Sequence, residues 1–451
     1  MKTTFCNSHY RTDSENSQKK VCKSASKEEL CKDLSICQDD KTVLSLFSGC
    51  GGLDIGFEGD FTCLRKSINT LIHPDWIQDG SGDWVSVKRT GFRTIFANDI
   101  RPDAKAAWVN YFSKKNPYAN IIYHLDSIVD LVKLEKEFHN VFPKNIDILT
   151  GGFPCQDFSI AGKRQGFKSE TSHKGARLVQ ENSTEENRGQ LYIWMREVIN
   201  ITNPKVFIAE NVKGLTNLNN VKDVIESDFS HAGKNGYIVV PSRVIHAADY
   251  GVPQNRERVI FFGFNKNFLK TSAIQALTDL ENNPDYDPYP IKTHNYTTQE
   301  PFLVPFVKVK DAFLDLDEPD ISSDPSQKKY SKAKFMGRHC QGQTEVNYDD
   351  VAPTIRSEHH GNIEFRRLAT ENGGKNISGN EIHCIERRLS VRECARLQTF
   401  PDNYQFILPK TESNISVNST NAYKIIGNAV PCLLGYNIAM RLAENWNKYF
   451  D

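Results

Sequence analysis

Residues 42–52 read TVLSLFSGCGG, a short apolar strand that ends in a glycine-rich turn. Similar apolar segments recur along the first two-thirds of the chain, at residues 93–97, 146–149, 206–209 and 259–262. Helical patterns lie between several of them, as at residues 191–201. Strands that alternate with helices are typical of a mostly parallel sheet with helices on both faces. The sequence therefore predicts an α/β fold for this part of the chain.

The composition is that of an ordinary soluble globular protein. The chain has 451 residues, of which 39% are hydrophobic and 25% charged, and this length predicts two folded units. No apolar run approaches the roughly 18–20 residues of a membrane span. Residues 1–20 also lack the apolar core of a secretory signal. We therefore expect a cytoplasmic protein without a membrane partner.

Charge and cysteine content narrow the choice of partners. The 56 basic and 56 acidic residues cancel, but a nucleic-acid partner needs only a locally basic face. Residues 326–367 provide one candidate, with eight basic and five acidic side chains. A solvated charged surface is the alternative reading of this stretch. The 11 cysteines include no CxxC pair, so we expect free thiols and no metal site.

The character of the sequence changes twice along the chain. Residues 1–40 are polar and are predicted to form an appendage. Residues 41–264 carry the alternating strands and helices, and residues 265–422 are loop-rich. A final helix is predicted from Pro431 to about residue 446, because proline suits the first turn of a helix.

Polar residues follow the first strands of the predicted sheet. Glycines in the turn after residue 46 let the backbone approach a ligand at the carboxyl edge of the sheet. Asp54 replaces the third glycine of a GxGxxG pattern, which disfavours a nicotinamide oxidoreductase. Asp99 is placed to hold both ribose hydroxyls of a cofactor, and Asp126 to accept from an adenine amino group. Each acid could instead be a helix cap or a surface group.

Three further segments predict a reactive site at the same edge. Cys155 follows the strand 146–149 on a stiff Pro-Cys turn, and its thiolate would suit addition to an electron-poor ring carbon. Glu210 follows the next strand, and Arg256 and Arg258 are spaced to project to one face of an extended segment. These arginines could bind a phosphate or a carbonyl oxygen, or they could pair with buried acids. Thiol, carboxyl and guanidinium groups on successive strand edges make a competent site. A buried, inert cysteine is the alternative for Cys155 alone.

Taken in order, these segments resemble the motifs of the DNA (cytosine-5)-methyltransferase family. Six stretches carry the resemblance: residues 47–52, 151–156, 210–212, 254–258, 388–401 and 426–431. Ser390 stands where threonine is commoner in the family, which keeps the hydroxyl. Residues 60–90 are additional to the family pattern, and no role is predicted for them.

The resemblance implies an S-adenosylmethionine-dependent methyltransferase fold with a smaller, loop-rich target-recognition domain. The catalytic and cofactor-binding domain would be residues 41–264, with residues 423–451 returning to it, and residues 265–422 would recognise the target sequence. S-adenosyl-L-methionine is then the expected methyl donor, without a metal. Its expected contacts are Phe47, Ser48, Gly49, Gly51, Asp99, Ile100, Asp126, Asn428 and Val430.

The resemblance also implies a mechanism. Cys155 would add to C6 of a cytosine flipped out of the duplex, and Glu210 would protonate or hydrogen-bond N3. Arg256 and Arg258 would bind the carbonyl side of the base and the backbone phosphates. The expected DNA contacts are Gln156, Ser159, Lys332, Arg338 and Arg356, the last as a reader of a guanine edge.

The expected partner is double-stranded DNA. We expect a bacterial monomer that is nucleoid-associated through DNA and protects it from a separate restriction endonuclease. One alternative keeps the fold and methylates cytosine C5 in transfer RNA. Another is a catalytically silent DNA-binding relative, which the intact Cys155, Glu210, Arg256 and Arg258 disfavour.

Overall fold

The protein is described here by a computed structural model, which covers residues 40–154, 191–217, 220–297, 300–357, 363–376, 385–411 and 415–451. Three predicted site residues lie outside the described residues, namely Cys155, Gln156 and Ser159. The predicted appendage lies outside them as well, except for Asp40.

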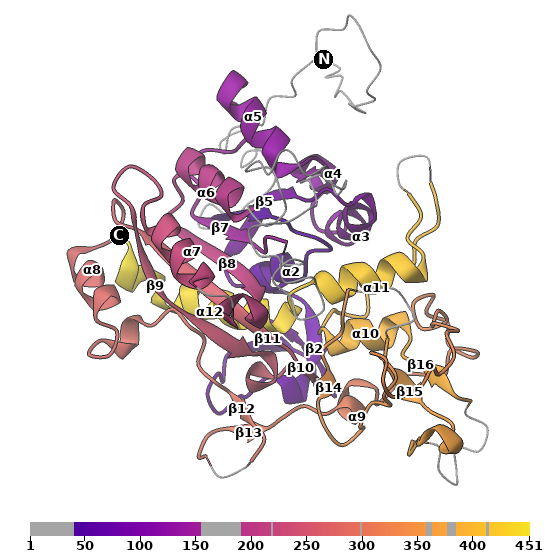
Figure 1. Cartoon of the computed structure of the whole chain (residues 1–451). Coiled ribbons are helices and arrows are strands. Elements are labelled where there is room, and N and C mark those ends of the chain that lie inside the picture. The colour runs from indigo at the N-terminus through magenta and orange to yellow at the C-terminus, as the bar shows by residue number, and fades with distance from the viewer. Residues whose placement is uncertain are drawn as a thin grey trace, which may run out of the picture.

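A seven-stranded sheet forms the centre of the described chain (Figure 1). Its strand order is β6-β5-β1-β7-β8-β11-β9. The bounds are β6 Tyr123–His124, β5 Phe92–Asn98, β1 Lys41–Leu46, β7 Ile148–Gly151, β8 Val206–Val212, β11 Glu257–Asn265 and β9 Tyr237–His246. The first five are parallel to one another, whereas β11 runs antiparallel to β8 and β9. The predicted mostly parallel α/β fold is confirmed.

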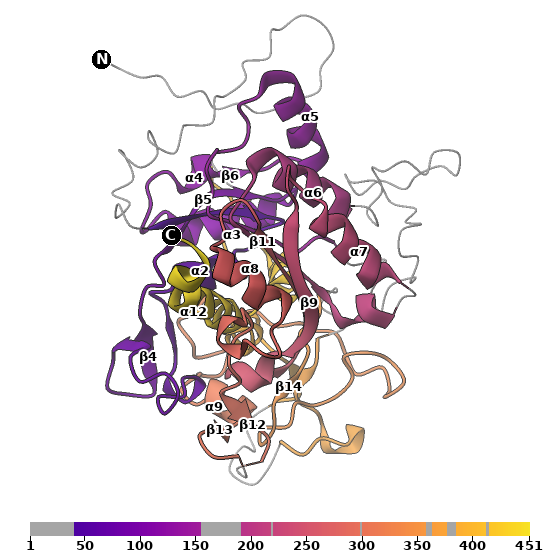
Figure 2. The ribbon, with the colours of Figure 1, turned by 90° about the vertical axis from the view of Figure 1, so that its left-hand side faces the viewer.

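Helices cover both faces of this sheet (Figure 2). One face carries α5 (Ile128–Phe138), α6 (Leu191–Thr202) and α7 (Val221–Ser230), which pack in a row. On the other face α2 (Gly52–Glu58) packs against α12 (Cys432–Tyr449). The remaining α-helices near the sheet are α3 (Pro102–Phe112), α4 (Ala119–Ile122), α8 (Thr271–Thr278) and α11 (Ser419–Asn428). Short 3-10 turns are η1 (Arg65–Ser67), η3 (Lys213–Asn217), η4 (Ala247–Tyr250), η5 (Pro284–Tyr286) and η7 (Thr370–Asn372).

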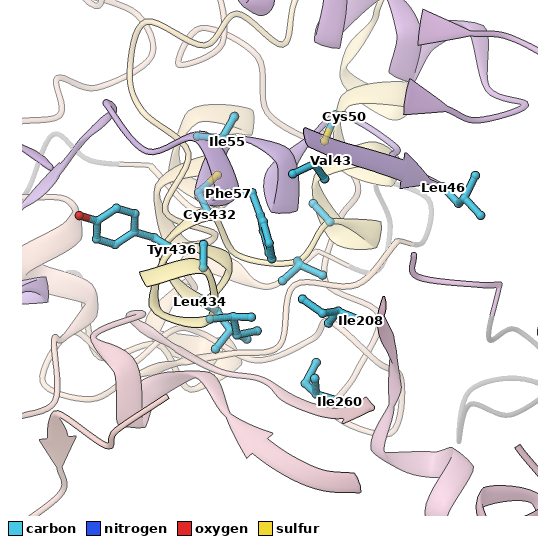
Figure 3. Packing of buried hydrophobic residues seen from close by; sticks show 14 of the residues in the cluster. Val43, Leu46, Cys50, Ile55, Phe57, Ile208, Ile260, Cys432, Leu434 and Tyr436 are labelled. Atoms are coloured by element: carbon cyan, nitrogen blue, oxygen red, sulfur yellow. The ribbon is translucent and has the colours of Figure 1, made fainter. Parts of the chain in front are cut away.

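The C-terminal helix completes the core of the sheet (Figure 3). Phe57 of α2 and Leu434 of α12 are fully buried together with Val43 of β1. Burial of each such side chain contributes roughly 1.5–3 kcal/mol, so the interface holds α12 firmly on the sheet. The helical stretch Ser419–Tyr449 is long and apolar enough to cross a bilayer, but 89% of its most apolar window is buried inside the protein. A buried helix in the core of a protein has the same length and apolar composition, so these two properties are weak evidence for a membrane span.

The second unit has few regular elements and is held by buried arginines. Its strands are β12 (His294–Asn295), β13 (Val304–Pro305), β14 (Ala352–Pro353), β15 (Phe365–Arg367) and β16 (Arg387–Arg388), and its helices are α9 (Val309–Ala312) and α10 (Val391–Leu397). The short strand β10 (Gln254–Asn255) belongs to the first unit and pairs with β14. Arg388 is fully buried and donates to the carbonyls of Ala333 and Gly342, at 2.8 and 2.6 Å. Such bonds satisfy loop carbonyls that no neighbouring strand reaches.

The predicted domain boundary at residue 265 stays a prediction. The chain beyond it first packs on the sheet, because Lys270 N donates to Tyr449 O at 2.9 Å. Tyr289 Oη also donates to the carbonyl of Ile260 in β11, at 2.8 Å. Residues 270–289 therefore lie against the first unit, and the loop-rich unit follows them.

Residues 60–90 form a small subdomain that contacts both units. They fold into a three-stranded sheet with the order β2-β4-β3, with β2 Thr62–Leu64, β4 Trp84–Val87 and β3 Ile77–Asp79. On one side Trp76 Nε1 donates to Glu444 of α12, at 3.3 Å. On the other, Trp84 Nε1 donates to Asp315, just beyond α9, at 3.1 Å. The insertion thus contacts both the C-terminal helix and the second unit.

Candidate functional site

The glycine-rich turn after β1 is tied to the end of the neighbouring strand β5. Ser48 N donates to Asn98 O at 2.8 Å, and Gly49 N donates to Asp99 Oδ2 at 3.0 Å. Phe47 adopts a φ of 53°, which is uncommon for a side chain of this size. These contacts fix the turn at the carboxyl edge of the sheet, where ligands of such folds bind.

The predicted cofactor acids follow the strands β5 and β6 in the chain. Asp99 accepts from Arg101 N and Gly49 N at 2.9 and 3.0 Å, and its side chain is partly buried. A carboxylate with two bound donors can still accept further hydrogen bonds. The side chain of Ile100 next to it is exposed. Asn98 Nδ2 donates to the carbonyl of Asp126 at 2.8 Å, which brings the turn after β6 to the same edge. The carboxyl edge of the sheet thus carries Asp99, Ile100 and the turn that holds Asp126, which are the predicted cofactor contacts.

The loop after α11 closes the other side of the turn. Asn428 is exposed at the end of α11, and Val430 follows it. A Cβ built at Gly52 would lie 2.2 Å from Val430 O, so only glycine allows this approach. The structure therefore brings Ala429 and Val430 to the turn that carries Phe47, Ser48, Gly49 and Gly51, and Asn428 directly precedes them in the chain.

Asp54 lies beneath the turn and has a structural role. Its carboxylate accepts from Ser45 Oγ at 2.6 Å and from Trp108 Nε1 at 2.7 Å. Burial raises the pKa of Asp54 to about 6, against the two hydrogen bonds, which lower it. The residue that breaks the GxGxxG pattern thus links β1 to Trp108 of α3 beneath the glycine-rich turn.

We expect Asp54 to make stability depend on pH. Because its pKa is about 6 in the folded protein and ordinarily 3.8, the folded state keeps this proton to higher pH than the unfolded chain. The unfolding free energy should therefore fall by about 3 kcal/mol as pH rises from about 4 to about 6. Asp54→Asn should remove this part of the slope in urea unfolding, whereas Asp83→Asn, at an exposed carboxylate, should not. Parallel slopes for wild type and Asp54→Asn would contradict the assignment.

Glu210 and Arg258 form an ion pair at the ends of β8 and β11. Arg258 Nε lies 2.7 Å from Glu210 Oε1, and the two side chains are 11% and 12% exposed. A Cβ built at Gly152 would lie 2.9 Å from Glu210 Oε2. Asn211 Nδ2 also donates to Phe153 O at 3.2 Å. The carboxylate therefore faces the segment that leads directly into Cys155.

Arg256 lies elsewhere than the sequence predicts. It is 1% exposed, and its guanidinium donates to the carbonyls of Ile355, Gly427 and Ala429, at 3.1, 3.0 and 2.9 Å. β10 ends at Asn255 and β11 begins at Glu257, so Arg256 stands at the break between two strands. The sequence predicts that Arg256 contacts the base and the backbone phosphates. In the structure its guanidinium is instead buried and bound to main-chain carbonyls.

The candidate DNA contacts of the second unit have varied surroundings. Arg356 Nη1 lies 3.1 Å from Glu364 Oε1, a carboxylate that is 1% exposed. Lys332 is exposed, with Nζ 3.6 Å from the ring centre of Tyr330, and Arg338 is exposed as well. Glu364 was not predicted as a site residue. A single acid between the apolar residues Ile363 and Phe365 gives no local signal of the arginine that it will pair with.

Comparison with known proteins decides the family. The family model of C-5 cytosine-specific DNA methylases matches residues 82–444. The chain belongs to this family. As a C-5 cytosine-specific DNA methylase it is a methyltransferase, which confirms the predicted enzyme class and fold. Within the described residues, no group of three or more His, Cys, Asp and Glu side chains is arranged to hold a metal ion.

The relatives of this methylase include curated bacterial enzymes. Type II methyltransferase M.BsuRI of Bacillus subtilis is 32% identical over 432 residues, covering 93% of this chain and 82% of the relative. Type II methyltransferase M.FnuDI of Fusobacterium nucleatum is 31% identical over 424 residues, covering 89% and 94%. The solved structure of the Entamoeba histolytica methyltransferase EhMeth has a TM-score of 0.52 at 15% identity, covering 91% of this chain and 99% of that one. The structural likeness shows the shared fold.

Proposed function

We propose that this methylase transfers a methyl group from S-adenosyl-L-methionine to C5 of a cytosine within a specific double-stranded DNA sequence. The reaction would proceed through a covalent bond between Cys155 and C6 of a flipped cytosine. The observation that supports this chemistry is the Glu210–Arg258 pair, which faces the segment before Cys155.

The first chemical step is addition of the Cys155 thiolate to C6, which breaks the aromaticity of the ring. C5 then becomes enamine-like and can attack a methyl group bound to sulfonium sulfur, which S-adenosyl-L-methionine supplies when bound. Loss of the C5 proton re-forms the double bond between C5 and C6 and expels the thiolate. The methylated base and free Cys155 complete the cycle.

Glu210 and Arg258 would act on the side of the ring where negative charge develops. A carboxyl at N3 can donate a proton or hydrogen bond as charge moves from C6 toward N3 and O2. Arg258 orients this carboxyl through the 2.7 Å contact with Glu210 Oε1. Nη1 of Arg258 donates to Glu257 O at 2.8 Å, so Nη2 would bind the carbonyl oxygen of the base. Neither residue would form a bond to C6, where Cys155 adds.

The cofactor would lie against the turn at residues 47–52. Asp99 would hold the ribose hydroxyls, and Asp126 the adenine amino group, as carboxylates at strand ends do in related sheets. The exposed side chain of Ile100 would contact the adenine ring. Asn428 and Val430 would line the opposite side.

Protection of DNA from a restriction endonuclease is supported by the relatives, whose names are those of Type II methyltransferases. The endonuclease would be a separate gene product, and the methylase would act as a monomer on DNA in the bacterial cytoplasm. The basic stretch at residues 326–367 supports DNA as the substrate.

The decisive experiment measures methyl transfer from labelled S-adenosyl-L-methionine to duplex DNA and, in parallel, to bulk transfer RNA. Wild type and Cys155→Ser are compared, and the DNA product is sequenced after bisulfite treatment. Transfer to DNA that disappears in the variant supports the proposal, and the protected cytosines give the target sequence. Transfer to RNA alone would replace DNA with RNA as the substrate. DNA binding without transfer to either would favour a silent relative.

Arg356 is expected to determine part of the target preference. Loss of one bidentate base contact typically costs about 1–3 kcal/mol, so Arg356→Ala should lower the preference for target over unrelated DNA by about 5- to 150-fold. Arg338→Ala removes an exposed cation and should weaken binding to both DNAs alike. Competition binding with the two duplexes measures this difference. If Arg356→Ala changes neither affinity nor preference, the assignment is wrong.

A further inference from the structure

Three buried polar side chains meet between the cofactor loop and the recognition unit. Gln254 comes from β10, Arg256 follows it, and Gln398 ends α10. All three are 0–1% exposed. Gln254 Nε2 donates to Gln398 Oε1 at 3.2 Å. We call these three residues the polar hub.

The polar hub fixes a loop of the recognition unit. Gln254 Oε1 accepts from Ile355 N at 2.9 Å, and Arg256 donates to Ile355 O at 3.1 Å. Both backbone groups of Ile355 are therefore bound, and the next residue is Arg356, the proposed reader of the target sequence. Any shift of this loop must break bonds to the hub.

The polar hub also fixes the loop beside the cofactor site. Arg256 Nη2 donates to Gly427 O and Ala429 O, at 3.0 and 2.9 Å. Gln398 Nε2 donates to Ile426 O at 2.8 Å. These carbonyls lie at the end of α11, where a helix leaves its last acceptors without partners of its own. The next residues along this loop are the proposed cofactor contacts.

The two loops touch each other as well. A Cβ built at Gly427 would lie 2.2 Å from Arg356 C and 2.4 Å from Ser357 N. On its other side the same loop approaches Gly52 through Val430 O. Contacts thus run without a gap from the glycine-rich turn to the backbone of Arg356.

A buried guanidinium that is bound by several fixed carbonyls has one favourable arrangement, because each lost bond leaves a desolvated polar group. The two Nη atoms of Arg256 divide between the loops, since Nη1 donates to one and Nη2 to the other. We propose that Arg256 is a positioning residue that couples occupancy of the cofactor site to binding of target DNA, without contacting the base. This inference rests on the proposed function.

The test measures the dissociation constant of target DNA with and without saturating S-adenosylhomocysteine. The ratio of the two constants is the coupling factor, and coupling between sites is typically about 5- to 150-fold. Arg256→Lys keeps the charge but has one ammonium that cannot serve both loops. We expect its coupling factor to fall toward one. Arg243→Lys, at an arginine of the edge strand β9 that pairs with Asp287, should keep the wild-type factor.

A structural role alone would lower thermal stability or both affinities but leave the coupling factor unchanged. An unchanged factor in Arg256→Lys, or a wild-type factor of one, would overturn the proposal. If Arg256→Lys does not fold, Gly427→Ala decides, because its Cβ separates the two loops while Arg256 remains. A wild-type factor in that variant would also overturn the proposal.

Steady-state kinetics provides a second readout. Arg256→Lys should raise KM for both substrates and change kcat little, whereas Arg258→Lys should lower kcat. A loss of kcat in Arg256→Lys at unchanged KM would place Arg256 at the base and overturn the proposal. Absence of methyl transfer in wild type would instead refute the proposed function, so the two failures are distinguishable.

Discussion

Replacement of Glu210 by glutamine is expected to lower the rate of methyl transfer by about 10²- to 10⁴-fold, the usual contribution of a positioned general acid. The amide keeps the shape of the side chain, but it cannot deliver a proton to N3. It also removes the negative partner of Arg258, 2.7 Å away. A single-turnover assay with saturating DNA and methyl donor measures the chemical step.

Glu257→Gln is the matched control for this variant. Glu257 is adjacent to Arg258 in the sequence, but its carboxylate pairs with Lys213 at 2.7 Å on the surface. It should retain the wild-type rate. A wild-type rate in Glu210→Gln would refute the role of Glu210 in the reaction.

A duplex with fluorine at C5 of the target cytosine separates addition and methyl transfer from the final elimination. Fluorine cannot leave as a proton does, so the covalent complex formed through Cys155 should accumulate. Glu210→Gln should form this complex slowly, and Cys155→Ser should not form it. Rapid complex formation by Glu210→Gln would place the role of Glu210 after methyl transfer.

The central sheet could be predicted from the sequence because its parallel strands are buried on both faces. Residues 206–209, for example, form an apolar run and lie within β8. The edge strand β9 could not be predicted in the same way. It contains Pro241, and several of its side chains are exposed, including Arg243. Such strands lack the continuous apolar pattern and tolerate proline because one side is unpaired.

The candidate site was predictable where strand geometry is regular. Glu210 and Arg258 come from paired strands, with Ile260 opposite Glu210 in the register, and their side chains meet. The spacing of Arg256 and Arg258 predicted that both side chains project to the same face. That prediction assumes one continuous strand through both residues. The chain breaks between β10 and β11 at Arg256, so this side chain turns into the polar hub.

The loop-rich unit was predictable only in its general character. Its contacts join residues far apart in the sequence, as when Arg388 donates to Ala333 O and Gly342 O. Arg387 likewise pairs with Glu318 at 2.9 Å. Local periodicity carries no information about which loop carbonyl or carboxylate a buried arginine will reach. The placement of this unit therefore depends on the structure.

Within that unit, Glu393→Ala should cause the largest loss of stability. Arg387 donates to both oxygens of Glu393 at 2.9 Å, and both side chains are 1% exposed. Glu393 also accepts from Ser390 N and so caps α10. Removal of one partner from a buried pair costs about 3–5 kcal/mol, a large part of the roughly 5–15 kcal/mol that stabilises a typical domain. Urea unfolding measures the loss.

The control for Glu393→Ala is Asp349→Ala, which removes the carboxylate of an exposed pair with Lys310 and should leave the unfolding free energy nearly unchanged.

The pH dependence of the Glu393 contribution gives a further check. Burial raises the pKa of Glu393, but the charges of Arg387 and Arg366 outweigh this and hold it at about 2, below its ordinary 4.5. The stabilisation by Glu393 should therefore be complete above about pH 4.5 and decline as pH falls toward 2. A deficit in Glu393→Ala that stays constant down to pH 3 would show that lost packing, and not the ion pair, accounts for it.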